Sequence, residues 1–266
     1  MRGPVVVGVD GAPSARGVVE AAAREAERRG TALRLVHAIG WSSGVVRWDP
    51  AGGGARDRVG RMLTEAERVA RRAAPLLDVT QEVLMGEPES VLETESRDAS
   101  LTVVGGHFPV ARPRKGSVAP YLTAHARCPV LVVRGRPEPA GAVVLAADGS
   151  WAMREAAEFA FAEAAARGAE LMALRRGQRS RGAPDGLAGI LRDLRKSHPE
   201  VTVHDRPVPG RLGRTLTDVS AHAQLVVVAA RGRRGLPRLP WDGTSRFLLR
   251  DAGCPVAVVP SNGHGG

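Results

Sequence analysis

Two aspartates follow short apolar runs at matching places in the two halves of the chain. Asp10 follows VVVGV, and Asp148 follows VVLAA. Gly105 and Ala229 end two later apolar runs, LTVVG and LVVVA. If the two runs of each half are neighbouring parallel strands, a carboxylate and a small residue meet at the carboxyl end of a sheet. Ligands of open parallel sheets bind at that end, where the strand order reverses.

A glycine and a hydroxyl residue precede the last helix expected in each half, as Gly116-Ser117 and Gly243-Thr244. The free N–H groups and the dipole of a helix N-terminus favour an anion there, so these pairs suit a phosphate group. The same pairs also suit an ordinary N-cap. The arrangement favours phosphate binding because it occurs twice, each time opposite a strand-end aspartate.

The elements that must position these residues repeat along the chain. VVVGVDGAPSARGVVEAAAREAERRG in the first half matches VVLAADGSWAMREAAEFAFAEAAARG in the second, and ARCPVLVV matches AGCPVAVV. The first half has about a dozen extra residues. They lie in a glycine-rich stretch at 41–56 whose residue types favour turns and show no helical or strand periodicity. The halves join at RGRPEPAG, a short stiff linker. We therefore expect two domains, at 1–136 and 141–266.

Each repeat alternates apolar runs with segments of helical spacing. In the first repeat the runs predict strands at 5–9, 32–38, 80–86, 101–106 and 129–135, and helices around 15–26, at 61–73, from 88 and after 117. Continuous apolar runs indicate strands buried on both faces, and helical crossovers are right-handed. The expected fold class is therefore α/β, with two tandem doubly wound domains that each contain a five-stranded parallel sheet with helices on both faces.

Composition and charge exclude several classes of function. The formal net charge is +10, but residues 1–137 and 138–266 each contribute +5, and only 3% of residues are aromatic. An even distribution without stacking platforms makes nucleic acid an unlikely partner, and codon bias in a GC-rich genome explains the arginines as well. Cys128 and Cys254 each precede proline and a strand-like run, which indicates structural roles without a disulfide or zinc. With no leader and no apolar span, we expect a cytoplasmic protein without a membrane partner.

The signature segments resemble those of the universal stress protein family, in two tandem copies that cover nearly the whole chain. They are VVVGVDG, LRLVHA, GEPESVL and CPVLVV in the first copy, and LAADGS, LVVVAARGRRG and CPVAVV in the second. The resemblance implies sheets in the strand order 3-2-1-4-5, pairing of domains through their fifth strands, and a role in stress survival. It also implies ATP, with Mg²⁺, bound through the pattern G-x2-G-x9-G-[ST]. An aspartate and a valine that commonly face the nucleoside in this family point to Asp10 and Val36.

Both copies depart from that glycine pattern. In the first copy Gly106, nine residues and Gly116-Ser117 fit its last part, but Val103 occupies the first glycine position. If Gly105 is taken as the first glycine, Phe108 replaces the second and the loop is two residues short. In the second copy Ala229 replaces the first glycine, where its methyl is expected to crowd a close backbone approach. Gly232 keeps the second glycine, and ten residues precede Gly243.

The sequence therefore predicts a nucleotide-binding sensor or switch and not an enzyme. No P-loop, H-E-x-x-H or G-x-S-x-G string occurs, and the seven histidines are scattered. One alternative is a scaffold with decayed sites that acts through an unknown protein partner; another is a basic nucleic-acid binder. If only one site binds, we expect the second, because its longer loop carries Arg231, Arg233 and Arg234.

The matched repeats generate a first prediction. The two domains pair within the chain about a pseudo-twofold axis, with VLVV of the first and VAVV of the second side by side, because a bare edge strand invites aggregation. A homodimer is compatible with this arrangement. An experimental structure with the two fifth strands on opposite outer surfaces of the molecule contradicts the prediction.

Overall fold

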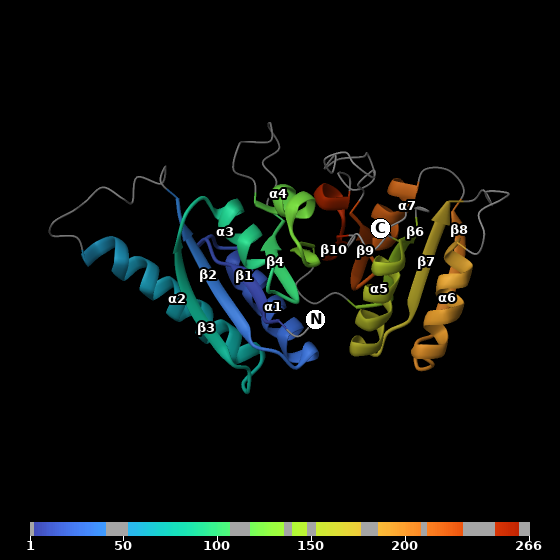
Figure 1. Cartoon of the computed structure of the whole chain (residues 1–266), viewed down its shortest axis with the longest axis horizontal. Helices are drawn as coiled ribbons and strands as arrows, with labels where there is room; N and C mark the ends of the chain where they lie inside the picture. Colours follow the sequence, from blue (N-terminus) through green and yellow to red (C-terminus); the bar gives the residue numbers. More distant parts are fainter. Residues whose placement is uncertain are drawn as a thin grey trace. The chain divides into compact units, whose positions relative to one another are not determined.

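The computed structural model describes residues 3–40, 53–106, 118–135, 140–147, 153–176, 186–208, 212–230 and 248–260. The chain divides into two compact units, Met1–Val133 and Arg134–Gly266 (Figure 1). The division falls just before the proline-containing linker that the sequence predicts at 137–140. Each unit is described by itself below.

The first unit alternates strands and helices along the chain. Its elements are β1 (Val5–Gly8), α1 (Ala15–Arg29), β2 (Leu33–Ile39), α2 (Gly53–Ala73), β3 (Val79–Met85), α3 (Pro88–Glu95), β4 (Leu101–Gly105), α4 (Val118–His125) and β5 (Val130–Val133). The strands are parallel and lie in the order β3-β2-β1-β4-β5.

The second unit repeats this plan. Its elements are β6 (Val143–Ala147), α5 (Met153–Arg167), β7 (Leu171–Arg176), α6 (Gly186–Ser197), β8 (Val203–Val208), α7 (Leu212–Ser220), β9 (Leu225–Ala229) and β10 (Val256–Val259). Its parallel strands lie in the order β8-β7-β6-β9-β10, and residues 248–251 are helical. The predicted fold class and the strand order 3-2-1-4-5 are confirmed in both units.

Helices cover both faces of the first sheet, as right-handed crossovers require. On one face, Gln81 of β3 donates to Glu67 of α2, with Nε2 and Oε2 2.5 Å apart. On the other face, Arg34 of β2 donates to Glu95 of α3, with Nη1 and Oε2 2.9 Å apart. Because successive strand residues point to opposite faces, these contacts place α2 and α3 on opposite sides of the sheet.

Helix α1 forms where the sequence places it, and α2 begins earlier than predicted. Gly30, with φ of 60°, ends α1 in the left-handed conformation that favours glycine. Helix α2 starts at Gly53 and not at residue 61, so the stretch at 41–56 is not irregular throughout. The sequence did not predict this start because glycine has a low helix propensity. Propensity is a weak guide where the packing of later residues stabilises the helix.

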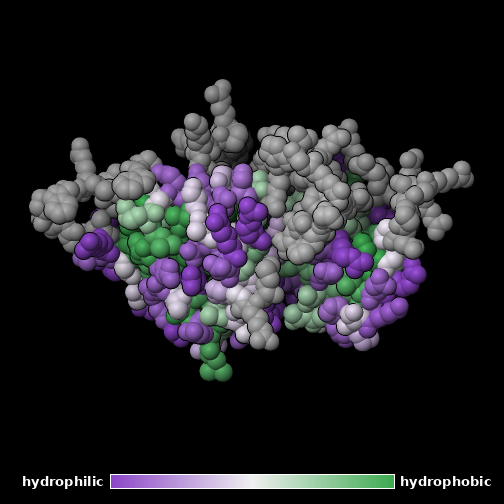
Figure 2. Space-filling model, viewed as in Figure 1, coloured by the Kyte–Doolittle hydropathy of each residue, from purple (hydrophilic) through white to green (hydrophobic). Residues whose placement is uncertain are grey.

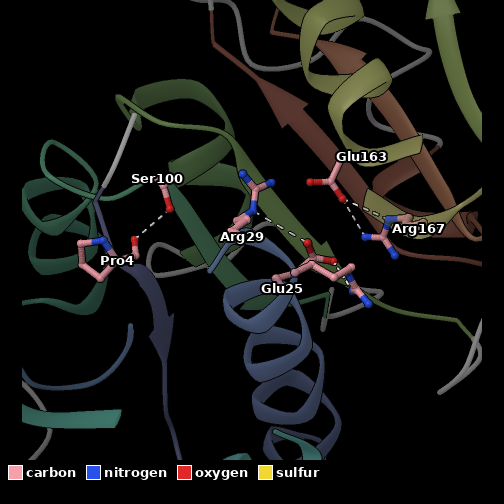
Figure 3. A network of polar contacts seen from close by, with 7 residues as sticks. Pro4, Glu25, Arg29, Ser100, Glu163 and Arg167 are labelled. Carbon is pink, nitrogen blue, oxygen red and sulfur yellow. Dashed lines mark hydrogen bonds and ion pairs between the residues drawn. The ribbon is translucent and has the colours of Figure 1, made fainter. Parts of the chain in front are cut away.

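Each unit buries a glutamate on its first helix. Glu25 of α1 lies 2.7 Å from Arg28 and 3.9 Å from Arg29, and is 3% exposed. Glu163 of α5, its equivalent in the repeat, lies 2.8 Å from Arg167. Figure 3 shows both carboxylates directed at arginines of their own helices. A buried carboxylate needs such a cation, because burial without one is costly.

The described residues on the face seen in Figure 2 are mostly hydrophilic, with a few apolar patches. Among the described residues, the large hydrophobic side chains that are exposed are Leu76, Val83 and Met85. No described helix has the length and apolar character needed to cross a membrane.

Burial in the sheet predicts which leucine side chains contribute to the free energy of unfolding. Leu35 of β2 is completely buried, whereas Leu76, between α2 and β3, is 99% exposed. We expect Leu35→Ala to lower the free energy of unfolding by about 2–5 kcal/mol through lost burial and a residual cavity. Leu76→Ala, the matched control, should change it by less than about 0.5 kcal/mol. Urea denaturation measures both, and equal effects would contradict the assignment of Leu35 to the core.

Candidate functional site

The centre of each sheet is the place where the strand order reverses. In the first unit β1 lies beside β4, with Val5 opposite Leu101 and Val7 opposite Val103. In the second unit β6 lies beside β9, with Val143 opposite Leu225. The residues that follow β1 and β4 therefore leave the same end of the first sheet, as the sequence predicts for Asp10 and Gly105.

Asp10 is exposed, and its orientation is fixed by a local turn. The backbone N–H of Ala12 donates to Oδ1 of Asp10 over 2.9 Å. Gly11, between them, has a φ of 74°, and a β-carbon there would lie 2.9 Å from Sδ of Met62 in α2. A larger residue would be strained in this conformation and would also collide with Met62. The turn thus presents a carboxylate to solvent beside a half-buried methionine of α2.

The end of β2 holds Val36 and His37 close to Asp10. Val36 is only 1% exposed and its backbone carbonyl accepts from the N–H of Val9 over 2.9 Å, so its side chain belongs to the core. Ala38, two residues further along the same face, is half-buried and nearer the end of the strand. On the other face, Nδ1 of His37 lies 2.7 Å from the carbonyl oxygen of Val9, directly before Asp10.

A second carboxylate lies at the end of β3. A β-carbon on Gly40 would lie 3.1 Å from both carboxylate oxygens of Glu87, the N-cap residue of α3. The N–H of Gly86 donates to the carbonyl of Ile39 over 3.1 Å, which holds the ends of β2 and β3 together. The sequence search for chemistry missed His37, Met62 and Glu87. The only available signals were the LVHA string and the glycines at positions 40 and 86.

The end of β4 supplies the backbone from which the predicted phosphate loop departs. Gly105 is exposed and Gly106 half-buried, whereas Ala229 and Ala230 are buried at the end of β9. The N–H groups of Gly106 and Ala230 both donate within their sheets, to Val133 over 2.9 Å and to Val259 over 2.7 Å. Neither N–H is free for a ligand. The remaining predicted residues lie outside the described residues: Gly116, Ser117, Asp148, Gly232, Gly243 and Thr244.

The residues equivalent to Ala229 and to its helix neighbour differ between the two units. At the equivalent Gly105, a β-carbon would point at Val18 of α1, with 3.3 Å to Cγ2. The added methyl is therefore directed into the layer between sheet and helix, not over the open end of the strand. The second unit has Ala156 at the position equivalent to Val18, and both Ala156 and Ala229 are buried. The expected crowding of a ligand by Ala229 stays a prediction.

Helix α4 starts at Val118, directly after the predicted Gly116-Ser117 pair, and is tied to α3. Tyr121 donates through its hydroxyl to Glu93, with 2.7 Å between the oxygens. This hydrogen bond to a carboxylate raises the pKa of Tyr121. The tyrosine also stacks on His125, with ring centroids 4.1 Å apart. These contacts fix the helix that follows the loop in the first unit.

The described residues offer little for covalent or metal catalysis. Among them, no three His, Cys, Asp or Glu side chains are grouped so as to hold a metal ion. Cys128 and Cys254 are buried, unpaired thiols, and burial raises the pKa of Cys128. A buried, protonated thiol is a poor nucleophile. The described part of the site is suited to binding, through an exposed carboxylate and glycine-bounded strand ends.

Comparison with known proteins identifies the family. The sequence model described as "Universal stress protein family" matches residues 1–134 and 175–260. The chain belongs to the universal stress protein family. Its second match begins at Arg175, so β6, α5 and the position of Asp148 fall outside it. The described residues nevertheless place β6 and α5 in the second unit as β1 and α1 are placed in the first.

Curated relatives and a solved structure match this chain over nearly its full length, including both repeats. Universal stress protein Rv1996 of Mycobacterium tuberculosis is 32% identical, over 96% of this chain and 94% of its own length. Universal stress protein Rv2623 of the same organism is 32% identical, over 96% and 95%. The crystal structure of a universal stress protein from Archaeoglobus fulgidus matches all of this chain and 98% of its own, with 17% identity and a TM-score of 0.79. That structural likeness supports the fold.

The packing difference between the units generates a double-mutant prediction. We expect Gly105→Ala to lower the free energy of unfolding by about 1 kcal/mol, because its new methyl presses on Val18. In a Val18→Ala background, which copies the second unit, the same change should cost at least about 0.5 kcal/mol less. Urea denaturation of the four proteins measures the coupling. Additive effects would show that the methyl does not meet Val18.

Proposed function

We propose that this universal stress protein binds ATP or a related adenine nucleotide, with Mg²⁺, as a sensor or switch without rapid turnover. The observation that carries the proposal is the doubled switch point: β1 beside β4 in one unit and β6 beside β9 in the other. Each pair of strands leads into a glycine-containing loop and a Gly-Ser or Gly-Thr pair. A nucleotide needs such a combination, with polar groups for the nucleoside and N–H groups for phosphates.

At the nucleoside end of the first unit, Asp10 is the group we assign to the ligand. Its Oδ1 is engaged by Ala12, so the exposed carboxylate has a fixed orientation and retains acceptor capacity at its other oxygen. Asp148 is assigned the equivalent role in the second unit. Val36, near the end of β2, is proposed to face the nucleoside together with Asp10.

At the phosphate end, the donors must come from beyond the strands, because the N–H groups of Gly106 and Ala230 are already bonded. We assign this role to Gly116 and Ser117 in the first repeat, and to Gly232, Gly243 and Thr244 in the second. Mg²⁺ would be held chiefly by phosphate oxygens and water, as is usual for this ion.

The two sites are proposed to differ in affinity, with the second preferred. Gly106 and Ala230 make equivalent backbone hydrogen bonds at the ends of β4 and β9, and the loops that follow differ in length and charge. The second loop carries arginines, whose guanidinium groups match phosphate oxygens. A scaffold that acts through protein contacts is the rival function, and it requires no nucleotide.

Nucleotide titration of paired variants tests the proposal. Isothermal calorimetry should detect ATP binding to the wild type in the presence of Mg²⁺. Gly243→Val with Thr244→Ala should weaken it at least about tenfold, because a side chain fills the space for a phosphate. The matched control, Gly116→Val with Ser117→Ala, should change it by less than about threefold. Loss of binding only in this control would move the preferred site to the first repeat, and a wild type without heat or thermal shift would favour the scaffold.

Intrinsic fluorescence gives an independent readout. All four tryptophans lie in connections that follow the carboxyl ends of strands: Trp41 and Trp48 after β2, Trp151 after β6 and Trp241 after β9. Ligand at the second site should change the emission of a variant that keeps Trp151 and Trp241 and has phenylalanine at the other two positions. The reciprocal variant should respond weakly. The opposite pattern would place the ligand in the first unit.

A further inference from the structure

Strand β3 forms one edge of the first sheet, with β2 on one side and no described strand on the other (Figure 1). It contains no proline, and Glu82 is its one charged residue. Val83 and Met85, on this strand, are 46% and 56% exposed. With Leu76, which precedes the strand, they are the large hydrophobic side chains that are exposed among the described residues. A long, unblocked edge strand with apolar side chains is a template for pairing with another strand.

The backbone of β3 offers hydrogen-bonding groups along this edge. The N–H of Leu33 donates to the carbonyl of Asp78 over 2.8 Å, and the N–H of Gly86 donates to the carbonyl of Ile39 over 3.1 Å. Because β2 and β3 pair in a continuous parallel register, the even-numbered residues of β3 between these two bonds also face β2. The N–H and C=O groups that point away from the sheet therefore belong to Gln81, Val83 and Met85.

The equivalent edge of the second unit is blocked. Strand β8 also lies at the end of its sheet, and the N–H of Leu171 donates to the carbonyl of Thr202 over 2.9 Å. By the same alternation, Pro207 occupies an outward position, where it has no N–H to donate. Asp205 and Arg206 beside it are exposed. Proline and charge are the usual means of protecting an edge strand, so the unprotected outer edge is found on β3 and not on β8.

Helix α2 leaves the side chains at the β3 edge uncovered. It packs over both β2 and β3, and Gln81 of β3 donates to Glu67 over 2.5 Å. Gly60 and Thr64, seven and three residues before Glu67, lie on the same side of the helix. A β-carbon on Gly60 would have no neighbour within 4 Å. With residues this small beside the edge, a second helix has room to approach α2.

The exposed surface of α2 carries a row of charges that alternate in sign: Asp57, Arg61, Glu65 and Arg68. Such a row is complementary to a reversed copy of itself. Asp57 then lies opposite Arg68 of the other copy, and Arg61 lies opposite Glu65. Arg68 also contacts Glu65 in its own helix, but both side chains remain more than half exposed and can take a further partner.

We propose that two copies of this chain form a dimer by antiparallel pairing of their β3 edges. A twofold axis at Val83 places Val83 opposite itself and Gln81 opposite Met85, so the outward N–H and C=O groups of both copies bond to each other. An axis at Glu82 would place two carboxylates opposite each other, which is unfavourable. The dimer is closed, because each copy uses its only β3 edge.

The strand and the charge row share one axis. Val83 lies about 7 Å beyond Gln81 along β3, which corresponds to between four and five residues of a helix. Because a crossover helix runs antiparallel to its strands, counting back from Glu67 puts the axis near residue 62 or 63 of α2. The midpoint between Asp57 and Arg68 falls at the same place.

The spacing also suits contact between the two helices. Since α2 lies over β2 and β3, the two copies of the helix would be separated by about two strand spacings, which is about 10 Å. Packed helices have interaxial distances close to this value. The surface uses none of the residues assigned to nucleotide, so dimer formation and nucleotide binding are separable.

Sedimentation velocity tests the proposal. The full-length protein should pass from monomer to dimer between about 1 and 100 µM. Val83→Lys should raise the dissociation constant at least about tenfold, because a charge at the axis meets its own copy. Leu76→Lys makes the same exchange at an exposed position outside the strand and should stay within about twofold. A wild type that remains monomeric, or equal weakening by both variants, overturns the proposal.

Cysteine cross-linking tests the register without destabilising the dimer. In Val83→Cys the two thiols lie opposite each other, with Cα atoms about 5.5 Å apart, which is within the range of a disulfide. Mild oxidation should therefore give a covalent dimer, whereas the native cysteines are buried. In Thr80→Cys, the control on the same strand, the thiols are about 20 Å apart and should not react. A covalent dimer from the control and none from Val83→Cys overturns the proposal.

A charge exchange tests the contact between the helices. Asp57→Arg should weaken the dimer at least about threefold at low ionic strength, because two like-charged pairs form across the axis. Adding Arg68→Asp restores opposite charges and should return the dissociation constant to within about twofold of the wild type. A double variant as weak as Asp57→Arg contradicts this arrangement of α2.

Discussion

The parallel pairing of the first and fourth strands is the interaction on which the rest of each unit depends. Val5 and Val7 of β1 lie opposite Leu101 and Val103 of β4, and all four side chains are almost completely buried. From this pair the chain proceeds outward in two directions, through β2 and β3 on one side and through β5 on the other. The crossovers therefore lie on opposite faces, and the connections after β1 and β4 diverge.

The two repeats keep this backbone while their side-chain packing differs. Gly105 lies beneath Val18 in the first unit, and Ala229 accompanies Ala156 at the equivalent positions of the second. A close-packed layer has room for about one methyl group at that point, and either the strand or the helix supplies it. The buried glutamates at positions 25 and 163 were retained together with their arginines. Loss of either partner would leave an uncompensated buried charge, so such a pair changes less easily than two apolar residues.

The positions of the charged residues in this protein are informative, whereas its net charge is not. The net charge of +10 is shared equally by the two halves and indicates no particular partner. On α2, in contrast, Arg71 and Arg72 of the last turn pair with Glu67 and Glu65 and lie where the helix dipole favours positive charge.

The sequence by itself determined the repeat, the α/β class and most strands and helices. Apolar runs such as VVVGV and LTVVG are sufficient for this, because strands buried on both faces have no polar side and cannot be placed elsewhere. Strand order came from the resemblance to a family. The places of Asp10 and Gly105 at one end of the sheet followed from that order.

Only the tertiary structure decided which neighbours each of these residues has. The side chain of Val36 is 1% exposed in the core of the sheet, and Ala38 stands closer to the end of β2. The neighbour that a β-carbon at position 105 would have depends on where α1 packs. The same holds for the methyl group of Ala229 at the equivalent position. Met62 and Glu87 are distant in sequence from Gly11 and Gly40, and they lie beside these glycines only after α2 and α3 pack. Local pattern fixes which face of an element is apolar, but contacts between elements depend on packing across the whole domain, which no short stretch of sequence encodes.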